Sequence, residues 1–63
     1  MDVGIFDEAG KRVFMTTVNL NALNYEPKLD EYFNEAWRAA VEDGIVNVGD
    51  RDKYKVLKIA VVP

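Results

Sequence analysis

Hydrophobic and polar residues alternate at the start of the chain, in the sequence MDVGIF. Residues 1, 3 and 5 fall on one side of an extended chain and residues 2, 4 and 6 on the other, which is the period of a β-strand. The sequence DEAG that follows favours a type I turn in which Gly10 has a positive φ. RVFMTTVNL is rich in β-branched and aromatic residues and is typical of a returning strand. The first twenty residues therefore predict a β-hairpin.

The returning strand is largely apolar on both of its sides. Val13 and Met15 alternate with Phe14 and Thr16, so each side contains at least one large hydrophobic residue. One side is expected to meet a helix and the other a second chain. The uncovered side of the sheet is expected to contain Phe6 or Phe14, Val18 and Leu20.

An amphipathic helix is predicted from about Lys28 to Asp43, after a loop in which NLNALNYEP supplies three asparagines and a proline. Its apolar residues recur at steps of three and four and form one stripe. Gly44 is placed to end the helix in the left-handed conformation, with Ile45 folding back over the last turn. The stripe consists of Leu29, Phe33, Ala36, Trp37, Ala40 and Val41.

The last third of the chain contains one further strand, predicted in KYKVLKIAVVP. Its first half alternates charge with bulk and its second half is apolar on both sides, which indicates a strand that starts in water and ends in the interior. IVNV, before it, is either a very short strand or an apolar return segment. GDRD is a turn signal between the two.

These elements predict one small α+β domain spanning residues 1–63, with element order ββαβ. If the last strand lies beside the first, every strand pair is antiparallel. The expected fold is a three-stranded antiparallel sheet of order 2-1-3 with one helix packed on one face.

A chain of this length buries a small core, and it contains no cysteine and no histidine. Disulfides, zinc sites and Cys or His nucleophiles are therefore not expected. The acidic pairs lie at turns and helix ends, where carboxylates usually cap or face water. Asp50 and Asp52 begin a calcium-loop pattern that Tyr54 interrupts. We expect no enzyme activity, no cofactor and no metal, and we expect support from a second copy in a homodimer.

Charge is distributed unevenly along the chain, whose net charge is −3. Residues 29–49 contain five acids and one base, whereas residues 50–63 contain two acids and four bases. Such a dipolar surface suits a protein partner better than a polyanion. The strip from Arg51 to Lys58 could bind nucleic acid, but lysines on an exposed strand also discourage unwanted pairing, which is the preferred interpretation.

Association with a protein, as a homodimer or with another partner, is thus the leading functional hypothesis. Nucleic-acid binding through the Arg51–Lys58 strip is one alternative. An acidic inhibitor that mimics nucleic acid, with the helix acids Asp30, Glu31, Glu35, Glu42 and Asp43, is another. The candidate interaction surface comprises Phe14, Val18, Leu20, Trp37, Arg51, Lys53, Tyr54 and Lys55.

The longest apolar run, residues 59–62, is far too short to cross a membrane, and the chain begins with an acid where a signal peptide has a basic start. A cytoplasmic protein without membrane contact is expected.

Overall fold

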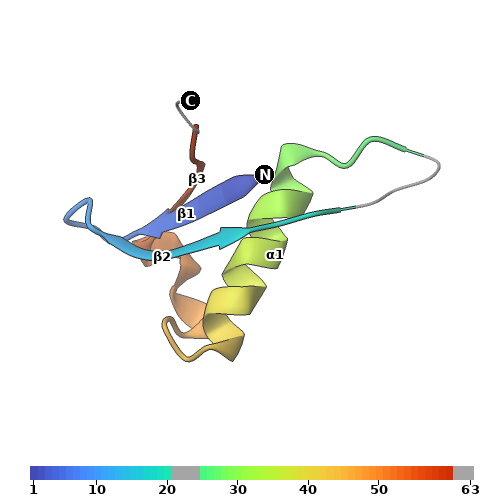
Figure 1. Cartoon of the computed structure of the whole chain (residues 1–63). Helices are drawn as coiled ribbons and strands as arrows, with labels where there is room; N and C mark the ends of the chain where they lie inside the picture. The colour runs from blue at the N-terminus through green and yellow to red at the C-terminus, as the bar shows by residue number, and fades with distance from the viewer. Residues whose placement is uncertain (21–24, 61–63) are drawn as a thin grey trace.

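The computed structural model describes residues 1–20 and 25–60 of the chain. Within them are the strands β1 (Asp2–Phe6), β2 (Arg12–Thr17) and β3 (Lys55–Lys58), the helix α1 (Leu29–Glu42) and the 3₁₀ helix η1 (Val48–Lys53). The strands form one sheet in the order β2-β1-β3, and both strand pairs are antiparallel. The helix α1 crosses one side of this sheet (Figure 1). The predicted ββαβ fold and its strand order 2-1-3 are confirmed.

The β1–β2 hairpin closes through the predicted turn. The N–H of Gly10 donates to the carbonyl of Asp7 at 3.0 Å, and Gly10 has a φ of +83°. The Asp7 carboxylate accepts the N–H groups of Ala9 and Lys11, both at 2.9 Å. A short acidic side chain at the first turn position thus satisfies backbone donors that the strands leave unpaired.

A β-bulge interrupts the hairpin just after the turn. Ile5 pairs with Phe14 and Phe6 pairs with Arg12, so Val13 is an extra residue on β2. Both Val13 and Phe14 pack against the core cluster. A bulge re-aims side chains in this way and increases the local twist of the strand.

The helix ends where its sequence predicts. Gly44 has a φ of +75°, and the N–H groups of Gly44 and Ile45 donate to the carbonyls of Val41 and Ala40, both at 3.0 Å. This is the hydrogen-bond pattern of a Schellman motif. At position 44 a residue with a Cβ would be strained in this left-handed conformation. The Ile45 side chain stays 46% exposed, and the next residue, Val46, enters the core instead.

The core lies between α1 and the side of the sheet that carries Val3 and Ile5, both fully buried. Ala36 and Ala40 are also fully buried, and their small side chains let the helix approach β1 closely. Trp37 packs in one cluster with Ile5, Ala40 and Val46. Burying one side chain as large as Ile5 contributes roughly 1.5–3 kcal/mol.

Of the two alternatives for IVNV, the structure leaves the return segment: these residues form no strand and run through bends into η1. The prediction that the last strand ends in the interior is wrong for its described part, since β3 stops at Lys58, Ile59 is only half-buried and Ala60 is exposed. One helix covers only one side of the sheet, so side chains on the other side remain in water. The predicted continuation through residues 61–63 and the loop residues 21–24 lie outside the described residues.

Candidate association surface

The side of the sheet opposite α1, here called the open face, is covered by no helix or strand of the described chain. The strand register and the bond from the Ile59 N–H to the Asp2 carbonyl arrange nine residues on it in three rows. The rows are Thr17, Asp2 and Ile59; Met15, Gly4 and Leu57; and Arg12, Phe6 and Lys55. In the middle row, the apolar residues Met15 and Leu57 lie on either side of Gly4.

Gly4 occupies the centre of the open face and is buried there by two neighbouring side chains. A Cβ on Gly4 would lie 2.7 Å from Cδ1 of Ile59 and 3.0 Å from Cε1 of Phe6. The rings and methyl groups of these residues therefore lie directly over the glycine backbone. Met15 and Leu57 flank them at 50% and 48% exposure. Phe6, Met15, Leu57 and Ile59 form one apolar group, which we call the open-face cluster.

Polar groups border this cluster at both ends of the face. The Thr17 hydroxyl donates to the Asp2 carboxylate at 2.6 Å, which pairs the acid within the sheet. Arg12 and Lys55 lie beside Phe6 in the opposite row. A half-exposed apolar centre with a polar border is the usual arrangement of a protein-binding patch.

The sequence prediction placed several residues on the wrong side of the sheet. Phe14 packs against the helix-side core, and Val18 is only 8% exposed in a cluster with Val3 and Ala36. Leu20 packs against the same cluster. Because opposite residues in an antiparallel pair share a face, the partners of Val3 and Ile5 must face α1. Of the expected residues, only Phe6 belongs to the open face.

Trp37, Tyr54 and Arg51 meet at the end of the molecule where η1 lies against α1. The centres of the Trp37 and Tyr54 rings are 5.6 Å apart, and the central carbon of the Arg51 guanidinium lies 5.9 Å from the centre of the Trp37 ring. Arg51 also donates to the side-chain carbonyl of Asn34 at 2.7 Å. Trp37 is 6% exposed, so it is a core residue. Sequence reasoning missed Asn34, which has no local pattern linking it to a residue 17 positions away.

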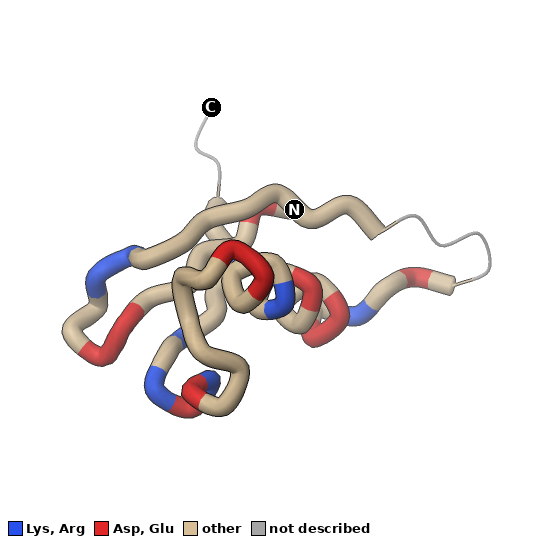
Figure 2. The backbone as a smooth tube through the Cα atoms, turned by 90° about the horizontal axis from the view of Figure 1, so that it is seen from below, with Lys and Arg blue, Asp and Glu red and all other residues tan. Residues whose placement is uncertain are grey.

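The Arg51–Lys58 strip does not form one continuous basic surface. Lys53 pairs with Asp50 at 3.6 Å, and Lys55 and Lys58 project from opposite sides of β3. Figure 2 shows the basic and acidic positions mixed in this segment. Lysine at both ends of β3 suits the interpretation that the strip discourages strand pairing.

The helix acids are also partly engaged. Glu31 accepts the N–H of Lys28 at 2.8 Å at the start of α1, and Tyr25 donates its hydroxyl to the other oxygen of Glu31 at 3.2 Å. Glu35 pairs with Arg38 at 2.8 Å. The acidic positions follow α1 in Figure 2, and Arg38 lies between them in the sequence.

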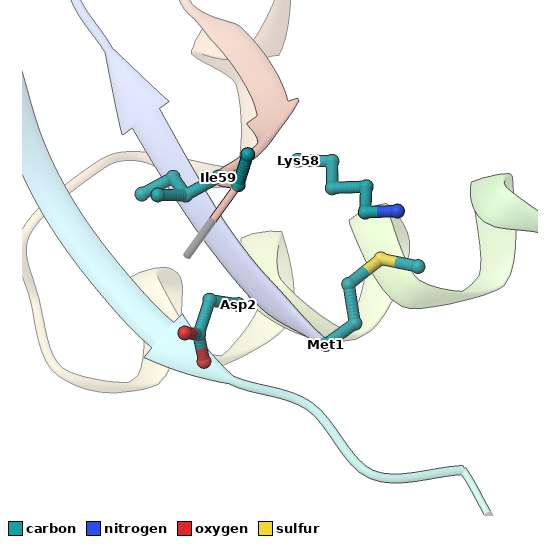
Figure 3. A pocket seen from close by; sticks show the side chains of 5 residues that line it. Met1, Asp2, Lys58 and Ile59 are labelled. Carbon is teal, nitrogen blue, oxygen red and sulfur yellow. The ribbon is translucent and has the colours of Figure 1, made fainter. Parts of the chain in front are cut away.

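A shallow hollow lies where β1 begins and β3 ends. Asp2 and Ile59 lie on one side of the two strands there, and Met1 and Lys58 lie on the other (Figure 3). The polar groups therefore do not converge on one point. In residues 1–20 and 25–60, no group of three or more acidic side chains is placed to hold a metal ion. No helix in this part of the chain is long and apolar enough to span a membrane.

Comparisons with protein-family models, with curated proteins and with solved structures gave no significant match to this chain.

Proposed function

We propose that this protein acts by association with protein chains, first of all with a second copy of itself, and that its sheet provides the contact surface. The observation that carries the proposal is the unequal covering of the sheet. One face lies under α1, whereas the other exposes Met15 and Leu57 beside Phe6 and Ile59.

Exposed apolar area favours association because its removal from water is worth about 25 cal/mol per Å². A second copy is present wherever the chain itself is present. Two-fold symmetric dimers are also the commonest assemblies of soluble proteins. A chain of 63 residues with no cysteine has few other means of adding to its core.

Nucleic-acid binding has weaker support. The Arg51 guanidinium is held by Asn34 and Trp37, and Lys53 is paired with Asp50. The chain carries a net charge of −3, which opposes the approach of phosphates.

A matched pair of substitutions tests whether the sheet is the surface used. Met15 on β2 is 50% exposed and Leu29 at the start of α1 is 46% exposed, so lysine at either position costs the fold little. Light scattering on a size-exclusion column should give a wild-type mass that rises from one chain towards two with concentration. Met15→Lys should weaken this association roughly tenfold, since it replaces apolar area that association removes from water and adds one like charge to each copy. Leu29→Lys should leave it unchanged. A mass of one chain throughout, or equal effects of the two variants, would contradict the proposal.

A further inference from the structure

Within residues 1–20 and 25–60, no strand pairs with the outer edge of β2 or of β3. The N–H of Val18 donates to the carbonyl of Met1, and the N–H of Ile59 donates to the carbonyl of Asp2. Backbone groups alternate in direction along a strand, so every second residue points away from β1. On β2 the outward residues are Met15 and Thr17, and on β3 they are Val56 and Lys58.

The two edges differ in charge. From Val13 to Val18 the chain contains no charged side chain. β3 has Lys55 and Lys58 at its two ends and Lys53 just before it, with no acid among residues 53–60. Two β3 edges placed together would gather at least four lysines from the two copies. Lysines are a common protection of edge strands, and β2 lacks that protection.

We propose that two copies of this chain join through the outer edge of β2, in an antiparallel pair centred on Thr16. This inference rests on the proposed function and names the partner and the strand that it uses. A two-fold axis through Thr16 places Met15 of one copy opposite Thr17 of the other, and both are outward residues. Two such pairs form four N–H···O=C bonds and join the sheets into one of six strands.

The side chains brought together by this register are compatible. On the helix side, Phe14 faces Val18 of the second copy, an aromatic residue against a β-branched one. Thr16 faces its own copy at the axis. The nearest charges on β2 are the two Arg12 side chains, which lie about 26 Å apart along the strands at 3.3 Å per residue. The charge-free edge is thus complementary to itself, which is the condition for a two-fold interface.

A contact limited to one strand pair is small beside the 1,200 Å² or so that stable complexes bury, so we expect a concentration-dependent equilibrium. On the open face, Met15 of each copy lies beside Thr17 of the other and loses part of its exposed surface, whereas the rest of each open-face cluster stays uncovered. Leu57 lies on β3, away from the axis, whereas Met15 lies next to it. Leu57→Lys should therefore weaken the dimer less than Met15→Lys does, although Leu57 is as exposed as Met15.

Amide hydrogen exchange of the whole chain, followed by NMR at low and high concentration, tests the inference residue by residue. Phe14 and Thr16 point towards β1 and should be protected at both concentrations. Met15 and Thr17 should exchange at least tenfold more slowly at the high concentration, because a bonded edge amide opens only when the dimer dissociates. Val56 and Lys58 should exchange equally fast at both.

The alternative results separate this inference from the proposed function. A dimer in which Met15 and Thr17 gain no protection, or in which Leu57→Lys weakens association as much as Met15→Lys, overturns the β2 pairing and leaves association through the open face. Protection of Val56 and Lys58 instead assigns the interface to β3 and also overturns it. Protection of Met15 and Thr17 only when a different protein is added, with a single-chain mass before, replaces the second copy with an extended foreign strand. A single-chain mass without any partner overturns both proposals.

Discussion

The two sides of β1 are buried by different means. On one side Val3 and Ile5 have no exposed surface, because α1 lies over them with its small residues Ala36 and Ala40. On the other side Gly4 has no side chain, and Phe6 and Ile59 cover its backbone. One side of β1 thus belongs to a core between the sheet and α1, whereas the other side is covered only by the side chains of Phe6 and Ile59.

This difference indicates how a very small sheet tolerates one face without a helix. A glycine at the centre lets an aromatic ring and an isoleucine close over the backbone, which keeps the middle of the open face dry. The flanking residues Met15 and Leu57 remain half in water. We infer that the open face is stable enough to be left uncovered and apolar enough to take part in association.

The largest difference between the two faces is expected from shortening one aliphatic side chain on each. Ile5→Ala should cost about 2–5 kcal/mol, since it leaves a cavity in a fully buried site. Leu57→Ala removes atoms that are half exposed and should cost at most about 1 kcal/mol. Urea unfolding followed by circular dichroism measures both, and similar losses for the two variants would remove the distinction between the faces.

Adding a side chain at the centre of the open face should have the next largest effect on stability. Gly4→Val should destabilise by about 1–3 kcal/mol, because its Cβ would collide with Ile59 and press on Phe6. Gly49→Val is the control: nothing lies within 4 Å of a Cβ there, so its effect should stay within about 0.5 kcal/mol. Unchanged or increased stability of Gly4→Val would show that Phe6 and Ile59 do not form a tight cover.

Removal of the Arg51 contacts that join η1 to α1 should have a smaller effect on stability. Arg51→Met removes the cation over the Trp37 ring and the bond to Asn34, and should cost about 1 kcal/mol. Arg38→Met breaks only an exposed pair with Glu35, and such pairs contribute about 0–1 kcal/mol. Thermal unfolding of both variants measures the difference, and a greater loss from Arg38→Met would contradict the role given to Arg51.

The smallest expected effect concerns pH and the start of α1. The hydrogen bond to Glu31, and then the negative charge of that carboxylate, raise the pKa of Tyr25 above the ordinary value of 10.0. The folded protein thus favours the protonated phenol, so the contribution is complete below pH 10 and is lost as the pH rises through the raised pKa. NMR titration of the tyrosine rings should give a lower pKa for Tyr25 in Glu31→Gln. An unchanged pKa would mean that the bond is absent in solution.

Local signals predicted most of this fold. The Asp7–Gly10 turn, the helix stripe and the Gly44 stop are each encoded within a few adjacent residues. The order 2-1-3 was expected from placing the last strand beside the first, which makes every pair antiparallel. Contacts between distant residues were not predictable in this way. The bond from Arg51 to Asn34 depends on how η1 packs against α1, and no pattern in the sequence marks it.

The assignment of strand sides failed for a physical reason. β2 is apolar on both sides, so its own pattern does not identify the side that meets the helix. β1 holds the missing information: a helix gains little from packing on Gly4, whereas Val3 and Ile5 offer it two large side chains. Phe14, as the partner of Ile5, then belongs under α1. The bulge at Val13 adds to the ambiguity, since it shifts the alternation by one residue.

Sedimentation equilibrium of the wild-type protein from micromolar to millimolar concentration tests whether a sheet covered on one side only makes this chain associate. We expect a reversible exchange between one chain and two, displaced towards one chain by Met15→Lys. A sedimenting mass of one chain over the whole range would contradict it.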